Sequence, residues 1–288
     1  IIERCIIKQN LADGILGVDS DPIVVGCGIS DNGGAGISLY SVEHNTAVVI
    51  NCRLLANVLD GVSCDNTNLD IANCLIAGNG GDGFRAYSSL LLNITNCTIV
   101  ENAELGFSAE ECRTTVANSI IRDNGLGQIW EDYGILRLRY CNIEGGWGGI
   151  AVIDAEPNFV ADGAWVDVND PNIIVEPNDP NALWLEGDYH LLAGSACIDV
   201  GENASLGEDV ADLDGDSNTV EALPLDLDYL PRIIDGDCNG TDVVDMGAYE
   251  AGCACTGDFD ADCDVGLSDY AMLASAWLAG EGQPRYNP

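Results

Sequence analysis

The stretch TNCTIVENAELGF, residues 95–107, decides the fold, because its pattern recurs along the first half of the chain. In each copy a cysteine or serine serves as a marker for the other positions. The markers are Cys5, Cys27, Cys52, Cys74, Cys97, Ser119 and Cys141. They follow one another at intervals of 22 to 25 residues. This period indicates one supersecondary unit that is repeated along the chain.

Two further positions keep step with the markers and are aliphatic in every copy. Two residues after the marker stand Ile7, Ile29, Leu54, Ile76, Ile99, Ile121 and Ile143. Three residues before it stand Ile2, Val24, Val49, Ile71, Ile94, Val116 and Leu138. Because alternate residues of a strand point to the same face, we expect both sets to line the interior of stacked strands.

An asparagine follows most markers at a distance of five residues. These asparagines are Asn10, Asn32, Asn57, Asn79, Asn102 and Asn124. Asparagine tolerates a left-handed backbone and bonds neighbouring amides, so the stacked copies predict an asparagine ladder. A coil of about 22 residues with short strands and inward aliphatic side chains is typical of a parallel β-helix. Leucine-rich repeats have a similar length but a different leucine spacing.

The repeat resembles the right-handed parallel β-helix superfamily, both in residues 95–107 and in INCRLLANVLDGV, residues 50–62. The predicted fold class is all-β, a right-handed parallel β-helix or solenoid with a loop-rich C-terminal extension and a small helical calcium-loop module. We expect the β-helix repeats over residues 1–155, a closing segment over 156–252 and the calcium-loop module over 253–288. Such a resemblance defines a fold and leaves the activity open.

The composition excludes some partners. The chain has 48 acidic and 10 basic residues and a formal net charge of -38, so it would repel nucleic acid. No apolar run approaches the roughly 20 residues of a membrane span. Thirteen cysteines without zinc-site spacing favour an oxidising compartment, and we expect a secreted protein at the cell surface.

The closing segment contains GDYHLLAGSACIDVGEN, residues 187–203, and LPLDLDYLPRIIDGDCNGTDVVDMGAYE, residues 223–250. It resembles the ending of secreted bacterial β-helix proteins, especially planctomycete-like ones. The resemblance implies that ten residues of the segment are scaffold positions, so that His190 is structural and not catalytic. The ten are Asp188, Tyr189, His190, Cys197, Asp199, Arg232, Asp235, Asp245, Gly247 and Tyr249.

Two acidic motifs predict calcium, Ca2+, as a cofactor, because closely spaced carboxylates supply the oxygen ligands that this ion requires. The first motif is a D-x-D-G-D-x-N run made of Asp212, Asp214, Asp216 and Asn218. The second is GDFDADCDVGLSDYAMLASAWLAG, residues 257–280, which resembles one half of a type I dockerin. The loop positions that match the dockerin pattern are Asp258, Asp260, Asp262, Asp264 and Asp269.

The marker thiols are expected to form a buried stack, because Ser119 replaces cysteine at the same position. Other cysteines are disulfide candidates. We consider a bond from Cys263 to Cys253 or Cys255, and a second bond between Cys197 and Cys238. Four N-x-S/T sequons mark candidate glycosylation sites, at Asn93, Asn96, Asn203 and Asn239.

Three classes of function can be compared on the sequence. A polysaccharide lyase needs a Lys or Arg near acids, and Arg137 and Arg139 are the best pair, while hydrolase motifs are missing. A polysaccharide-binding module would show an aromatic stripe, and none is evident at one repeat position. Because Ile1 begins within a coil, we expect head-to-tail self-association into a calcium-braced fibre. The sequence thus favours a non-enzymatic structural or adhesive protein, with polysaccharide binding or cleavage as the alternative.

Overall fold

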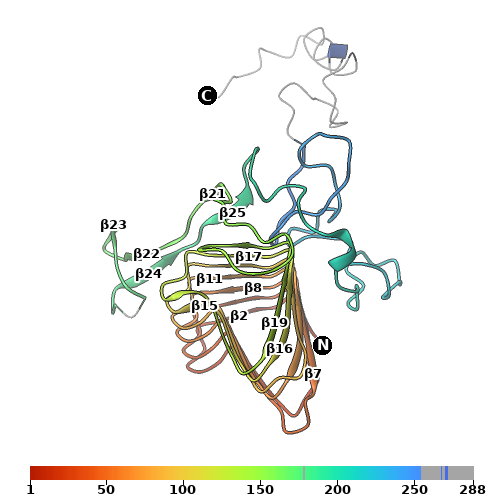
Figure 1. Ribbon diagram of the computed structural model, residues 1–288. Coiled ribbons are helices and arrows are strands. Elements are labelled where there is room, and N and C mark those ends of the chain that lie inside the picture. Colours follow the sequence, from red (N-terminus) through yellow and green to blue (C-terminus); the bar gives the residue numbers. More distant parts are fainter. Residues whose placement is uncertain (178, 254–266, 268–269, 272–288) are drawn as a thin grey trace.

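Three parallel sheets wind around one core in the computed structural model, which describes residues 1–177, 179–253, 267 and 270–271. Seen along the coils, the three sheets form the sides of a triangle (Figure 1). We name them sheet A, sheet B and sheet C in the order in which the chain visits them. Each strand pairs with the strand one coil away, so the predicted parallel β-helix is confirmed.

Sheet A contains β1 (Ile2–Glu3), β4 (Ile23–Val25), β7 (Thr46–Ile50), β10 (Asn68–Ala72), β13 (Leu92–Thr95), β16 (Arg113–Ala117) and β19 (Ile135–Arg139). Sheet B contains β2 (Ile6–Lys8), β5 (Gly28–Ser30), β8 (Arg53–Leu55), β11 (Leu75–Ala77), β14 (Thr98–Val100), β17 (Ile120–Arg122) and β20 (Asn142–Ile143). Sheet C contains β3 (Ile15–Val18), β6 (Ile37–Tyr40), β9 (Val62–Asp65), β12 (Phe84–Tyr87), β15 (Leu105–Glu110) and β18 (Gly127–Asp132).

The core is built from the positions that the repeat predicts. The inward aliphatic residues and the marker cysteines form one buried cluster that runs through the coils. The cysteines are free thiols, buried from Cys27 onward, and each donates to a backbone carbonyl two residues before it, as Cys74 does to Ala72 at 3.1 Å. Ser119 makes the same bond to Ala117 at 2.8 Å, which explains why a serine can stand at this position.

The asparagine ladder is present and continuous. From Asn10 to Asn102, each side-chain amide donates to the side-chain oxygen of the asparagine in the next coil, as from Asn57 to Asn79 and from Asn79 to Asn102, both at 2.9 Å. The last of them, Asn124, donates to Gln128 at 2.7 Å. The left-handed backbone lies one residue earlier than expected, for example at Ala56 and Glu101. The ladder asparagines therefore contribute hydrogen bonds, and the residue before each of them makes the turn.

The chain after the coils folds back over the outside of the β-helix. β21 (Phe159–Ala161) pairs with β25 (Asp188–Leu191), and β22 (Ala164–Asp167) pairs with β23 (Asp170–Ile174) and β24 (Ala182–Leu185). A single 3-10 turn, η1, spans Asn203–Ser205. Apolar side chains of this segment cover the outer face of sheet B, where Tyr189, Leu227 and Tyr249 pack on Leu75 and its neighbours.

Buried ionic contacts hold this covering layer together. Arg232 is fully buried and donates to the backbone carbonyls of Asp245, Gly247 and Ala248. Its Nε lies 3.4 Å from Oε2 of Glu250, which is also buried. Since a buried guanidinium needs both hydrogen bonds and a countercharge, Arg232 has the scaffold role that the resemblance implies.

The disulfide pairing differs from the sequence-based expectation. Cys238 bonds to Cys253, with a Cα–Cα distance of 5.4 Å. The predicted pair of Cys197 and Cys238 is therefore wrong, as is a bond from Cys253 to Cys263. Cys197 is a free thiol buried against Ile120, and it accepts a hydrogen bond from Asn142 at 3.0 Å. Cys255 and Cys263 lie outside the described residues.

Candidate functional site

A groove runs along the outer face of sheet A. It encloses a cavity of about 530 Å³, and its floor is made by outward side chains of five consecutive strands. The floor residues are Val48, Ile50, Asp70, Ala72, Asn93, Thr95, Thr115, Ala117 and Arg139. Its wall is a segment of the covering layer, residues 202–223, which we name the strap. The strap lies beside sheet A, on the right of Figure 1.

Polar and apolar contacts place the strap at this edge. Glu202 accepts two hydrogen bonds from Arg139, at 3.0 Å from Nε and 2.7 Å from Nη2, and also one from the Ser205 hydroxyl. The Arg139 guanidinium lowers the pKa of Glu202. At the other end, Leu213 and Leu223 pack on the outward face of β4, β7 and β10.

A polar row crosses the floor of the groove. Asp70, Asn93, Thr115 and Arg137 occupy matching positions on four successive strands. Asn93 donates to Oδ1 of Asp70 at 2.6 Å. Because neighbouring strands lie about 4.8 Å apart, the row offers a polar partner at each step along a bound chain.

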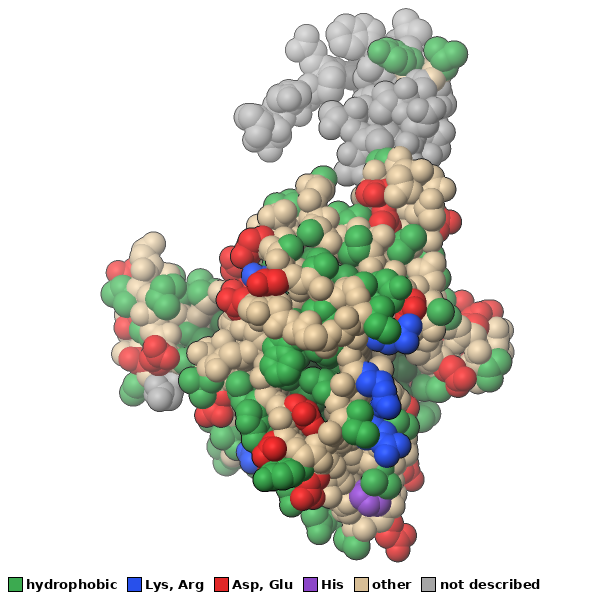
Figure 2. Space-filling view, in the orientation of Figure 1, with side chains coloured by type: hydrophobic (Ala, Val, Ile, Leu, Met, Phe, Trp, Pro, Cys, Tyr) green, Lys and Arg blue, Asp and Glu red, His purple; other side chains and the backbone are tan. Residues whose placement is uncertain are grey.

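The last two strands of sheet A make this face basic. Arg113 and Arg137 are exposed and point outward, and neither has an ion-pair partner among the described residues. Arg139 lies two residues further on, at the end of the groove. Figure 2 shows the blue side chains gathered in a column on the right of the molecule, over sheet A, while red side chains lie over sheet C. A chain with a net charge of -38 thus has one face with a local excess of guanidinium groups.

A second groove, of about 570 Å³, lies on the outer face of sheet C. Tyr87 and Trp130 line it together with Asp65, Arg85 and Glu110. Tyr40 and Tyr87 match in register across β9, and all three aromatic residues of this face are about half exposed. The expectation that no aromatic residues share a repeat position was therefore wrong for Tyr40 and Tyr87.

The predicted acidic run in the strap is partly brought together. Carboxylate oxygens of Asp212, Asp214 and Asp216 lie within 4.8 Å of one another. Asn218 is directed elsewhere, because its side chain donates to Glu221 at 3.1 Å. The predicted loop residues Asp258, Asp260, Asp262, Asp264 and Asp269 lie outside the described residues.

The structure adds two acidic residues that the sequence reasoning missed. Asp209, Asp214 and Glu221 form a second group of carboxylates within 4.8 Å of one another. Burial and the charge of Asp214 raise the pKa of Asp209, and burial and the charges of Asp216 and Asp214 raise that of Glu221. The D-x-D-G-D-x-N run itself includes neither Asp209 nor Glu221. The signal available in the sequence was only that both acids flank the run.

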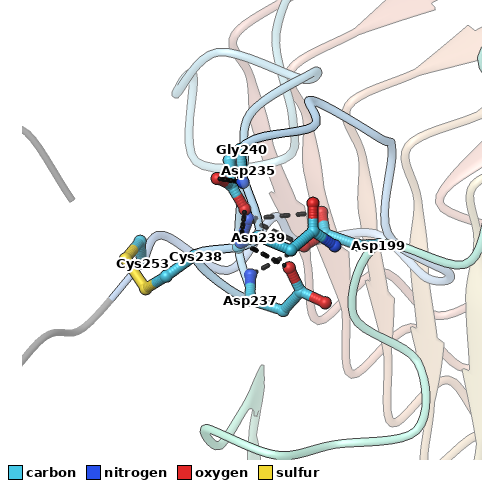
Figure 3. Close-up of a disulfide and its surroundings, with 8 residues drawn as sticks. Asp199, Asp235, Asp237, Cys238, Asn239, Gly240 and Cys253 are labelled. Carbon is cyan, nitrogen blue, oxygen red and sulfur yellow. Dashed lines mark hydrogen bonds between the residues drawn. A yellow bond between two sulfur atoms is a disulfide. The ribbon is translucent and has the colours of Figure 1, made fainter. Parts of the chain in front are cut away.

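A third acidic group lies beside the disulfide (Figure 3). Asp199 accepts from the backbone amides of Gly236 and Asp237, at 3.0 and 2.6 Å. Asp235 accepts from the amides of Asn239 and Gly240, at 3.0 and 2.6 Å. Since these carboxylates are already bonded to backbone donors, they shape the loop that carries Cys238.

The four sequons differ in accessibility. Asn203 and Asn239 are exposed. Asn96 is fully buried and its amide donates to the carbonyl of Asp245 at 3.2 Å, so it cannot carry a glycan in the folded protein. Asn93 lies in the floor of the sheet A groove.

Comparison with known proteins supports the fold. Residues 1–109 match the family described as "Right handed beta helix region", and the chain therefore contains a right-handed β-helix. No curated protein matches. Among solved structures, pectate lyase Pel9A is similar with a TM-score of 0.48 and 14% identity over 87% of this chain and 65% of that one. The periplasmic alginate epimerase AlgG is similar with a TM-score of 0.40 and 12% identity over 47% of this chain and 39% of that one.

These comparisons contradict the prediction that the chain is not an enzyme, because the similar structures are those of a lyase and an epimerase. This chain spans less than two thirds of either protein. At 12 to 14% identity the likeness is one of fold, so the chemistry of this chain has to be found in its own residues. No helix among the described residues is long and apolar enough to cross a membrane.

Proposed function

We propose that this protein acts on an acidic polysaccharide that lies along the outer face of sheet A. The observation that carries the proposal is the pair of exposed guanidinium groups of Arg113 and Arg137 on the outer face of sheet A, which have no ion-pair partner among the described residues. The substrate class is a chain of sugars that bear carboxylates. The proposed reaction begins with removal of the proton from the carbon next to the carboxylate, and it ends in epimerisation or in elimination.

Charge complementarity supports this choice of substrate. Over most of its surface a protein with a net charge of -38 repels a polyanion. The face that carries Arg113 and Arg137 is an exception, and a guanidinium group can bind a carboxylate with two parallel hydrogen bonds. The repulsion that the net charge predicts therefore applies to the molecule as a whole and not to this face.

The same arginines favour one type of chemistry. A base must take the proton next to the carboxylate, and Asp70 on the floor of the groove is the candidate acceptor. Negative charge then builds on the substrate carboxylate, and nearby cationic donors stabilise it. The proton can then be returned, or the neighbouring glycosidic oxygen can leave as a double bond forms. Hydrolysis needs two opposed carboxyl groups, and Glu202 in the groove is already held by Arg139 and Ser205.

Binding of a soluble oligouronate, measured by calorimetry, tests the site. Arg113→Ala and Arg137→Ala should each weaken binding about tenfold, which corresponds to about 1.4 kcal/mol for a lost charge-assisted contact. Lys8→Ala is the matched control, since it removes one exposed positive charge on β2 of sheet B. Equal losses in all three variants would mean that only net charge matters.

The aromatic face of sheet C offers a second binding surface, since exposed Tyr and Trp rings can stack on sugars. The same titration with Trp130→Ala separates the two surfaces. We expect little change, because the oligouronate is held by charge. A loss larger than that of the arginine variants would assign the ligand to sheet C instead.

Three properties predicted from the sequence remain proposals. A location outside the cytoplasm is supported by the disulfide between Cys238 and Cys253, which forms in oxidising compartments. Calcium is supported by the acidic groups of the strap. Self-association is a prediction that electron microscopy with calcium, and again after chelation, would test.

A further inference from the structure

The strap contains a closed loop with an acidic cluster at its base. The amide of Asp209 donates to the carbonyl of Glu221 at 2.9 Å, and the amide of Leu223 donates to the carbonyl of Gly207 at 2.9 Å. Glu208 and Ala222 form an antiparallel bridge between these bonds. The closure brings Asp209 and Glu221 together from the two ends of the loop, and Asp214 reaches them from within it.

Asp209 is an unusual member of this cluster, because its side chain is fully buried. Its Oδ2 accepts from the amide of Leu213 at 2.8 Å, while its Oδ1 has no hydrogen-bond partner among the described residues. Glu221 Oε1 is also buried, and it too has no hydrogen-bond partner among the residues that the structure describes. A buried carboxylate oxygen without a partner is destabilising, and two further carboxylates nearby add repulsion.

We propose that Asp209, Asp214 and Glu221 bind one calcium ion. The ion would supply the missing partner of both buried oxygens and would neutralise the repulsion. The ligand set is made only of carboxylate oxygens, which suits a hard cation and does not suit metals that prefer nitrogen or sulfur. Asp212 and Asp216 lie beside Asp214 and can add oxygens to the irregular coordination that calcium accepts.

The ion would hold the wall of the sheet A groove in place. Leu213 lies inside the loop and packs against Val25, Ile50 and Ala72 of sheet A. The groove is lined on this side by strap residues that include Glu208, next to the first ligand. Calcium at the base of the loop would therefore fix the strap on sheet A. The expected effect of calcium on oligouronate affinity rests on the proposed function. The ion site itself does not depend on that function.

Hydrogen exchange, read by mass spectrometry on the full chain without any polysaccharide, tests the ion site. Calcium at about 1 mM should slow exchange in peptides that cover residues 207–223 by about tenfold or more. It should also raise Tm by about 5 °C relative to the chelated protein. The exchange readout is local, so calcium bound to the predicted loop at residues 258–269 does not produce it.

Two variants distinguish loss of the ion from misfolding, because a misfolded variant would melt at a lower temperature. Asp209→Asn removes the charge of a buried side chain, and Glu221→Gln removes the charge of a half-buried one with a buried oxygen. Each variant should therefore melt at or above the wild-type temperature in chelator and should lose the calcium-dependent protection. Glu43→Gln, which removes an exposed carboxylate from the loop after β6, is the control and should behave as the wild type. Full protection by calcium in both ligand variants would overturn the site. Protection without any change in oligouronate affinity would overturn only its link to the groove.

Discussion

At Asn79 the stacking of coils can be followed bond by bond. Its side-chain amide donates to Asn102 at 2.9 Å and to the carbonyl of Leu54 at 3.0 Å, and its oxygen accepts from the amide of Asn57 at 2.9 Å. The residue is fully buried, so water cannot replace any of these partners. Asn79 therefore satisfies groups of three coils at once.

Truncation of one rung should be costly. Asn79→Ala leaves buried groups of Asn57 and Leu54 without partners, at about 1–3 kcal/mol for each group, so we expect a loss of about 3 kcal/mol. Asn10→Ala, at the exposed end of the same ladder, should lose less than about 1 kcal/mol. Chemical denaturation measures both values. Similar losses at the two positions would show that the ladder contributes little beyond local turn geometry.

The residue scale is where the sequence predicted most. Four features follow from contacts between equivalent positions one coil apart, such as Ile71 and Ile94. They are the repeat period, the inward aliphatic residues, the buried marker cysteines and the asparagine ladder. A repeat encodes these contacts directly. The pairing of Cys238 does not follow from any repeat. Cys197 lies instead on the outer face of sheet B, where it packs against Ile120 and Met246. Only the packing of the covering layer decides between these partners.

At the scale of elements, the covering layer is attached to the coils by single polar contacts as well as by apolar packing. Glu101, which follows β14, accepts hydrogen bonds from the amide of Gly163 at 3.0 Å and from the Tyr189 hydroxyl. Burial raises the pKa of Glu101 from 4.5 to about 7, although the bond from Tyr189 opposes the shift. Burial therefore favours the protonated acid, whereas the two hydrogen bonds that Glu101 accepts favour the ionised form.

Burial of the Glu101 carboxyl should make the stability of the fold depend on pH. Because the pKa of Glu101 is raised in the folded state, its stabilising contribution is complete below about pH 4.5 and is lost as the pH rises through about 7. Glu101→Gln should flatten the fall of Tm over this range, and Glu43→Gln should not. A series of melting curves measures the difference. An unchanged pH profile in Glu101→Gln would show that the carboxyl is ionised and solvated in the folded protein.

The strap marks the limit of the sequence-based prediction. Its acidic run is visible in the sequence, but the cluster of Asp209, Asp214 and Glu221 forms only when the loop closes between Asp209 and Glu221. Its docking on sheet A depends on contacts such as that of Leu223 with Ile50, far apart in the chain. The groove was missed for the same reason: Arg137 was noted, but the wall opposite it comes from another part of the chain.

At the scale of the whole molecule, the distribution of charge matters more than its sum. The net charge of -38 predicts repulsion of any polyanion when the charge is taken as uniform over the surface. The fold instead places Arg113, Arg137 and Arg139 on one face, beside a groove of about 530 Å³. An acidic substrate would thus be excluded from most of the surface and admitted along sheet A.

The proposed chemistry of this face is removal of the proton next to the carboxylate of a bound polyuronate. The most direct measurement is nuclear magnetic resonance of a polyuronate incubated with the protein and calcium in heavy water. We expect either an unsaturated sugar at a new chain end or deuterium at the carbon next to the carboxylate, and loss of both signals in Arg113→Ala combined with Arg137→Ala. A polymer that binds to the wild-type protein and yet shows neither signal would contradict the proposed chemistry.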